Sequence, residues 1–204
     1  MEVCTRVRSN ISRIILGSLL VCGQAVAQER HELVPDAAVV QYAGSIGFLS
    51  AGGSYDLFDR RRGSLDLLYG FVPESKGGQL DIITVKFAYR PLILEVGRGV
   101  TLRPLNPGAF LSYTADRDLS VVFDREQYGK GYYGWSEAFR LHLSLSQEAE
   151  FRSRRLMGKG PVKGVVLYSE LNASDLYLIS WVQNTGRISL ADILKLGLGV
   201  KVRF

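Results

Sequence analysis

The clearest pattern in the chain is a strict alternation of apolar and polar or small residues at its C-terminus. The apolar positions are Leu196, Leu198, Val200, Val202 and Phe204, and the residues between them are lysine, arginine or glycine. Side chains of a β-strand alternate between two faces, whereas a helix repeats about every 3.6 residues. This pattern therefore predicts a strand with one apolar face. The same alternation recurs in residues 64–73, 80–92 and 136–152.

Short segments rich in glycine, asparagine, aspartate and proline separate the alternating runs, as turns between strands do. The predicted strands are residues 42–58, 64–73, 80–92, 95–103, 106–115, 136–152, 163–172, 176–183 and 192–204. In the region 95–115, prolines at 91, 104 and 107 are expected at strand ends or turns. The one helix signal is a turn over residues 189–194, with Ser189 near its cap. We predict an all-β chain of antiparallel strands, closed into a barrel of about eight strands so that no edge is left unpaired.

Residues 1–27 have the composition of a cleavable export signal. Arginines precede a short apolar run, and small residues follow at Ala25 and Ala27, which is the pattern that signal peptidase cleaves. The apolar run is too short to span a bilayer as a helix, which takes about 20 residues. We predict cleavage after Ala27, a lead-in at residues 28–38 and one barrel domain at residues 39–204.

Composition narrows the classes of function. The chain of 204 residues is 47% hydrophobic and 22% charged, which is typical of a folded protein. Its formal net charge of +5 is too evenly balanced by acidic residues for a nucleic-acid-binding surface. Both cysteines, Cys4 and Cys22, lie in the predicted export signal, and Val21 disfavours acylation of Cys22 as in a lipoprotein. With only two histidines besides, we expect no metal site and no cofactor.

Alternation alone is compatible with two kinds of barrel. A soluble lipocalin-like binding barrel has its apolar faces inside, and an outer-membrane barrel has them outside, against lipid. The membrane kind is favoured by the export signal, by Phe204 at the end of an apolar face, and by opposite faces that mix charged residues with glycine and serine. Eight membrane strands of about 9–11 residues fit the chain length, and side chains just fill the interior of a barrel of that size.

The final strand resembles the C-terminal signature of bacterial outer-membrane β-barrel proteins. In that family the assembly machinery recognises a terminal aromatic residue preceded by alternating apolar residues, and Leu198, Val200, Val202 and Phe204 occupy those positions here. The resemblance implies a closed up-and-down transmembrane barrel in the bacterial outer membrane, with both termini in the periplasm. It implies the barrel-assembly machinery, membrane lipid and lipopolysaccharide as partners.

One group of residues is a candidate for catalysis. His142 and Ser144 lie two apart on a predicted strand and so share a face, with Glu148 further along it. The pair resembles the His-x-Ser of outer-membrane lipid A deacylases, which implies a catalytic histidine and serine with an orienting acid from Glu148, Glu150 or Glu170.

Two features of the same strand disfavour that hydrolase. First, Leu145 occupies the position where those enzymes usually have asparagine. Second, the leucines at 141, 143 and 145 are expected on the lipid-facing side of the strand, which places His142 and Ser144 in the lumen. We therefore expect a non-enzymatic structural, interaction or minor transport role, and keep the lipid A deacylase-like hydrolase as the alternative.

Three further groups of polar or aromatic residues are candidates for interactions. The loop at residues 124–135 is a candidate surface binding loop, or an aromatic girdle, through Tyr128, Tyr132, Tyr133 and Trp135. The arginines at 60–62 are either a solvated turn or a contact for lipopolysaccharide phosphates. The polar strand faces are expected to form ion pairs inside the narrow barrel through Lys86, Arg90, Arg140, Glu148, Glu150, Glu170, Lys201 and Arg203.

Overall fold

Strands make up most of the described chain. The computed structural model describes residues 34–76, 79–97, 99–115, 138–152 and 161–204. The strands are β1 (Ala37–Ala43), β2 (Leu49–Leu57), β3 (Gly63–Val72), β4 (Leu80–Tyr89), β5 (Leu94–Val96), β6 (Val100–Ala115), β7 (Phe139–Phe151), β8 (Gly164–Ser174) and β9 (Lys195–Arg203). The helices are the short 3₁₀ turns η1 (Asp59–Arg61) and η2 (Glu74–Lys76), and the α-helices α3 (Asp175–Gln183) and α4 (Leu190–Ile193).

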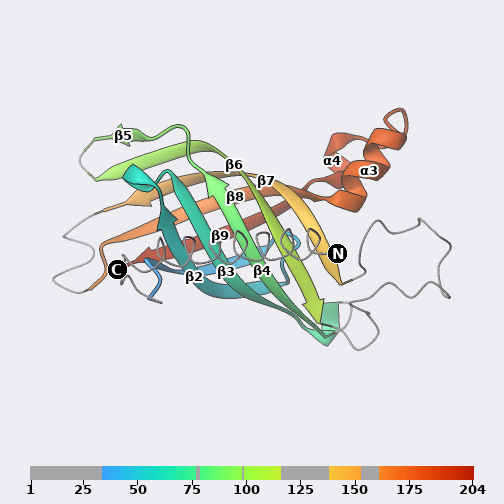
Figure 1. Cartoon of the computed structure of the whole chain (residues 1–204), viewed down its shortest axis with the longest axis horizontal. Helices are drawn as coiled ribbons and strands as arrows, with labels where there is room; N and C mark the ends of the chain where they lie inside the picture. The colour runs from blue at the N-terminus through green and yellow to red at the C-terminus, as the bar shows by residue number, and fades with distance from the viewer. Residues whose placement is uncertain (1–33, 77–78, 98, 116–137, 153–160) are drawn as a thin grey trace, which may run out of the picture. The chain divides into compact units, whose positions relative to one another are not determined.

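Eight of these nine strands close into an antiparallel up-and-down barrel. Each strand pairs with its neighbours in the order β1-β2-β3-β4-β6-β7-β8-β9, and β9 pairs back onto β1. Within the described residues β5 pairs with β6 alone, so it extends the wall without joining the ring. Figure 1 shows β5 and the C-terminus at one end of the barrel and α3 and α4 at the other. The predicted eight-stranded closed barrel is confirmed.

The predicted strand 42–58 is wrong, because the structure has two strands there. β1 ends at Ala43 and β2 begins at Leu49, and the turn between them has left-handed backbone at Ala43, Gly44, Ser45 and Gly47. Glycine adopts positive φ without the steric cost that other residues meet, so the two glycines allow the chain to reverse here. The turn folds inward, and Ile46 at its tip is completely buried.

The region 95–115 also differs from the prediction. A single sixteen-residue strand, β6, replaces two short strands, and Pro104 and Pro107 lie within it. Its register against β7 shifts between Arg103 and Asn106, which marks a β-bulge. Proline has no backbone N–H to donate, and a bulge is one of the few places in a sheet that tolerates this.

The predicted strand at 176–183 is also wrong, because these residues form helix α3. Ser174 caps its N-terminus by accepting a hydrogen bond from the Tyr177 N–H, and Asp175 lies in the first turn, where acidic residues are favourable. On the two sides of β8, pairing ends at His142↔Ser174 and at Asn172↔Lys195. Beyond these pairs, only residues 139–141 of β7 would lie beside a continuing strand, so most of its backbone groups would have no partner, whereas a helix satisfies them internally.

Helix α4 agrees with the predicted helical turn. The Ser189 backbone N–H and hydroxyl both donate to Asp192 Oδ2, at 2.9 and 2.8 Å. These hydrogen bonds lower the pKa of Asp192 below its usual value. The arrangement is a capping box, which fixes the start of the helix immediately before β9.

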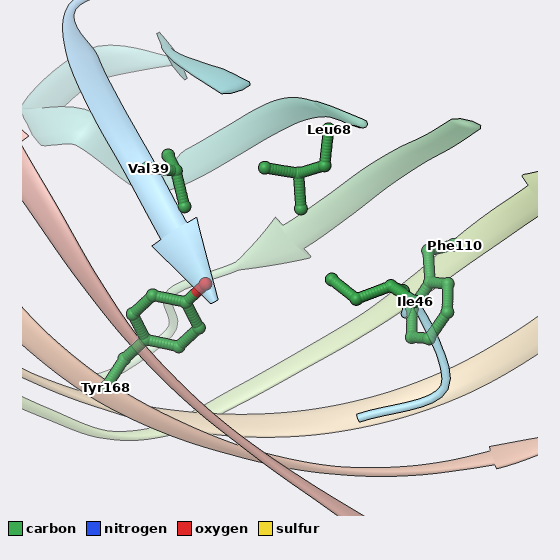
Figure 2. Packing of buried hydrophobic residues seen from close by; sticks show 5 residues of the cluster. All are labelled: Val39, Ile46, Leu68, Phe110 and Tyr168. Carbon is green, nitrogen blue, oxygen red and sulfur yellow. The ribbon is translucent and has the colours of Figure 1, made fainter. Parts of the chain in front are cut away.

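A small apolar cluster lies inside an otherwise polar barrel. Val39, Ile46, Leu68, Phe110 and Tyr168 come from β1, the β1–β2 turn, β3, β6 and β8, and their side chains meet in the lumen (Figure 2). The remaining interior is lined mainly by polar and charged side chains. The core that holds the strands in place is therefore mostly a network of hydrogen bonds and ion pairs.

Candidate functional site

The barrel interior carries balanced charge. Among the described residues, the buried charged side chains are Asp66, Lys86, Arg90, Arg103, Glu148, Glu150, Glu170, Lys201 and Arg203. The nearby Asp56 is largely buried and pairs with Arg203 and Arg90. These ten residues are five cations and five anions. Unpaired charge in a narrow, low-dielectric lumen would be costly, so the balance is what burial requires.

Glu148 joins three of the five cations. Arg90 donates to both of its carboxylate oxygens, from Nε at 2.9 Å and from Nη2 at 3.1 Å. Arg103 Nη1 lies 3.3 Å from Oε2, and Lys201 Nζ lies 3.7 Å from Oε1. Bidentate arginine–carboxylate pairs are among the strongest polar contacts in proteins. Removing Glu148 would leave these three buried cations with less negative charge to balance them.

A second set of contacts crosses the lumen nearer its centre. Lys86 Nζ on β4 lies 3.0 Å from Glu170 on β8 and donates to Gln41 Oε1 on β1 at 2.8 Å. The Tyr168 hydroxyl on β8 donates to the same Gln41 oxygen at 2.8 Å. Lys86 also lies over the ring of Phe110, 5.3 Å from its centroid. These side chains fill the space between strands on different sides of the ring.

The predicted ion-pair network is confirmed for seven of its eight residues, and three further residues belong to it. Arg140 lies at the rim of the barrel, where its Nη1 donates to the Phe139 carbonyl at 2.7 Å. Asp56, Asp66 and Arg103 were not predicted. The alternation along β3 could have predicted Asp66 as an interior residue, since it lies between Leu65 and Leu67, which face outward. The interior position of Arg103 could not be predicted in this way, because the predicted strand ended at that residue.

The structure places the candidate catalytic residues on one face of β7 but with different partners. His142, Ser144 and Glu148 all point into the lumen, as strand parity predicts, and each is at most 9% exposed. His142 Nε2 is 3.1 Å from the Ser112 hydroxyl, and its ring stacks on Phe110 at 4.3 Å between centroids. Glu148 binds the cations described above. The structure therefore places His142 against Ser112 and Phe110.

The outer surface of the barrel is apolar. Leu141, Leu143 and Leu145 of β7 are 44–55% exposed, while the residues between them are buried. In the C-terminal strand, Leu198, Val200 and Phe204 are exposed and Val202 is partly so. A lipocalin-like barrel needs the opposite arrangement, with apolar residues inside, and the described barrel excludes it.

Each end of the barrel has a cavity. At the end where β9 begins, about 640 Å³ is lined by the β1–β2 turn together with Ser112, His142, Ser174 and Tyr177, and by the cations Arg140 and Lys195. At the end where β1 begins and β9 ends, about 740 Å³ is lined by Arg60, Arg61, Arg62, Arg103 and Arg152 beside Leu92, Leu94 and Glu95. The first cavity combines hydroxyls and backbone with two cations, whereas the second has five arginines and one carboxylate.

Several predicted features lie outside the described residues. They are the export signal at residues 1–27 and the candidate loop residues Tyr128, Tyr132, Tyr133 and Trp135. Within the described part of the chain, no group of three or more His, Cys, Asp or Glu side chains is arranged to hold a metal ion. No helix among the described residues is both long enough and apolar enough to cross a membrane.

No protein-family model matches the chain, and no curated protein matches it. A solved structure described as "De novo design of transmembrane beta-barrels" is similar, with 12% identity, a TM-score of 0.37, and coverage of 85% of this chain and 100% of that chain.

Proposed function

We propose that the chain is a small integral β-barrel of the bacterial outer membrane, with a structural or interaction role and no enzymatic activity. The observation that carries this proposal is the inverted distribution of polarity. Exposed positions in the middle of the wall are aliphatic, for example Leu67, Val85 and Leu143, while the charged residues lie inside and are paired. In water such an exterior would be a large aggregation-prone patch, and in lipid it is the expected surface.

Exposed aromatic side chains support the same environment. Near the end where β9 begins they are Tyr42, Phe48, Tyr69 and Phe71. Near the end where β1 begins and β9 ends they are Phe58, Phe87, Tyr89, Phe151 and Phe204. Two aromatic girdles on either side of an aliphatic band are typical of membrane barrels, because aromatic rings favour the bilayer interfaces.

The filled lumen favours a structural or interaction role over transport. Side chains from β1, β4 and β8 meet across the interior through Gln41, Lys86, Tyr168 and Glu170. The β1–β2 turn adds Ile46 to this packing, and Asn172 Nδ2 donates to the Gly44 carbonyl at 2.9 Å. An eight-stranded barrel is expected to be closed by its own side chains in this way. Recognition would then be built on the ends of the barrel.

We orient the barrel from its connections. Those on the side where β1 begins and β9 ends are 58–62, 90–99 and 152–163, whereas the opposite side carries 44–48, 73–79 and the two longest, 116–138 and 175–194. Outer-membrane barrels have short periplasmic turns and longer external loops. We therefore place both termini in the periplasm and the α3–α4 region outside. The expected partners are the assembly machinery, phospholipid in the inner leaflet and lipopolysaccharide in the outer leaflet.

Fractionation and gel migration test the proposal. The protein expressed in a bacterium with an outer membrane should be recovered with that membrane, with its N-terminus at Gln28 after cleavage. A folded barrel should also migrate differently on a denaturing gel before and after heating, because the unheated barrel stays closed. Recovery in the soluble periplasm, with no heat-dependent shift, would contradict the proposal.

A further inference from the structure

Three consecutive arginines lie in the turn that joins β2 to β3. This arginine turn, residues 58–62, is at the end of the barrel where β1 begins and β9 ends, and Arg203 near the C-terminus pairs with Asp56 just before it. Phe58, Arg60 and Arg61 all have φ near +60°, in the left-handed region. Residues other than glycine persist in this region only where surrounding contacts hold them, so the turn is fixed in a conformation that the chain would not adopt by itself.

Contacts from the barrel hold the arginine turn in place. Arg90, which is buried and bound to Glu148, donates from Nη1 to the Arg61 carbonyl at 3.1 Å, and its backbone N–H donates to the Arg62 carbonyl at 2.6 Å. Outside the wall, the ring of Phe58 packs edge-on against Phe87, 6.3 Å between centroids. The interior network therefore positions the turn through its backbone and leaves its side chains available.

Two charges of the turn are unpaired. Arg61 lies 3.6 Å from Asp56 and 3.5 Å from Glu150, so it joins the edge of the interior network. Within the described residues, Arg60 and Arg62 form no ion pair. The buried network beneath them is balanced and has no carboxylate to spare for them. Asp59 is exposed in the same turn, so Arg60 and Arg62 leave an excess of one positive charge at the surface there.

The arginine turn forms one wall of the basic cavity of about 740 Å³. Arg103 lines the same cavity and is 98% buried, since its exposed fraction is 2%, and its Nε has no hydrogen-bond acceptor among the described residues. Arg152 also lines it, and its hydrogen bond to Glu150 raises the pKa of that arginine. The cavity is also lined by the apolar segment 91–94, in which Leu92 and Leu94 are each about half exposed, and by one carboxylate, Glu95. One cavity therefore combines five arginines with an apolar segment and a single acidic residue.

We propose that this cavity binds an anionic phospholipid, with the phosphate against Arg60 and Arg62 and the start of the acyl chains against Leu92 and Leu94. Arginine favours phosphate because its fixed donors match two phosphate oxygens at once. The inference rests on the proposed membrane location. With the termini in the periplasm, the arginine turn faces the inner leaflet, so its partner is phospholipid rather than the lipopolysaccharide considered from the sequence.

Lipid titration of the purified full chain in neutral detergent tests this site. Short-chain phosphatidylglycerol and phosphatidylcholine with the same acyl chains would be added separately, and bound lipid counted by native mass spectrometry. We expect phosphatidylglycerol to bind more tightly, and the double variant R60Q/R62Q to lose about thirtyfold in that affinity, since each basic residue near a lipid phosphate contributes about fivefold. Both side chains lack ion pairs among the described residues, so the variant should fold and keep its heat-dependent gel shift.

The variant K163Q/R187Q is the matched control. It removes the same charge from two exposed residues, one at each end of the barrel, and should leave phosphatidylglycerol affinity unchanged. Equal loss in the control would mean diffuse charge attraction, and equal affinity for phosphatidylcholine would mean no headgroup site. Displacement of the lipid by inorganic phosphate at the same phosphate concentration would mean a free-phosphate site. Each of these results would overturn the inference. None depends on where the protein fractionates in cells, so failure of the membrane proposal would be seen separately.

Discussion

The two faces of strand β7 differ both in burial and in polarity. Its outer face is a row of leucines at 141, 143 and 145, each 44–55% exposed. Its inner face carries His142, Ser144 and Glu148, all buried. Neighbouring residues of one strand therefore follow opposite rules, since the solvent outside is expected to be lipid and the space inside is closed and polar. The comparison shows that burial and apolarity are separate properties in this fold.

The two faces also differ in how specific they must be. An outer residue needs only to be apolar and of suitable size, because lipid makes no directional contacts with it. An inner residue must match its partners in charge and position, as Glu148 does with Arg90, Arg103 and Lys201. Substitutions on the inner face should therefore depend on the partner left behind, and those on the outer face on polarity and depth.

The largest effect is expected from Glu148→Ala on the inner face. The change leaves Arg90, Arg103 and Lys201 buried with too little negative charge, and breaking a buried pair in this way costs about 3–5 kcal/mol. The measurement is the free energy of unfolding in lipid vesicles, from a denaturant titration followed by circular dichroism. The control Glu148→Gln keeps the shape and one acceptor oxygen, so it should lose less. A loss below about 1 kcal/mol for the alanine variant would contradict the role given to the network.

Leu143→Arg on the outer face should have the next largest effect. A charge at the middle of the lipid-facing wall costs about 2–4 kcal/mol, falling towards zero near the interfaces. The same unfolding measurement checks it, with Leu143→Ala as the control for lost apolar area without added charge. If the arginine variant is no less stable than the alanine variant, the outer face is not in contact with lipid.

Phe204→Ala should affect assembly more than stability. The ring lies at the outer rim and is 38% exposed, so its removal should change the unfolding free energy of refolded protein by less than about 1 kcal/mol. If the terminal aromatic is the assembly signal, the amount reaching the outer membrane in cells should nevertheless fall several-fold. Equal membrane yields for the variant and the natural chain would remove that role from Phe204.

The smallest effect is expected from Ser144→Ala. Ser144 lies inside the barrel, and Nε2 of His142 is within hydrogen-bond distance of the Ser112 hydroxyl. Its hydroxyl should therefore contribute less than about 0.5 kcal/mol, and lipid A extracted from cells that overproduce either form should have the same acyl chains. Loss of a lipid A change on this substitution would instead revive the hydrolase alternative.

Much of the fold was predictable because strand parity is a local property. The alternation around Leu198 and Leu143 correctly predicted strands, their apolar faces and the charged face opposite. Parity failed at α3, where Leu176, Leu178 and Ile179 are apolar at both odd and even positions. There the absence of a neighbouring strand decided for helix. The path of β6 through Pro104 was likewise set by pairing with β7 across a bulge.

The sequence by itself determined that the chain forms strands with one apolar and one charged face, because that information lies in residues two apart. Only the tertiary structure decided that the apolar face points outward, which acid meets which base, and that the arginine turn lies beside the start of β1 and the end of β9. Those features depend on residues far apart in the chain, such as Lys201 and Asp66, whose separation of 135 positions closes only when β9 pairs with β1. Ring closure is therefore what converts a local pattern into a balanced interior and a basic end.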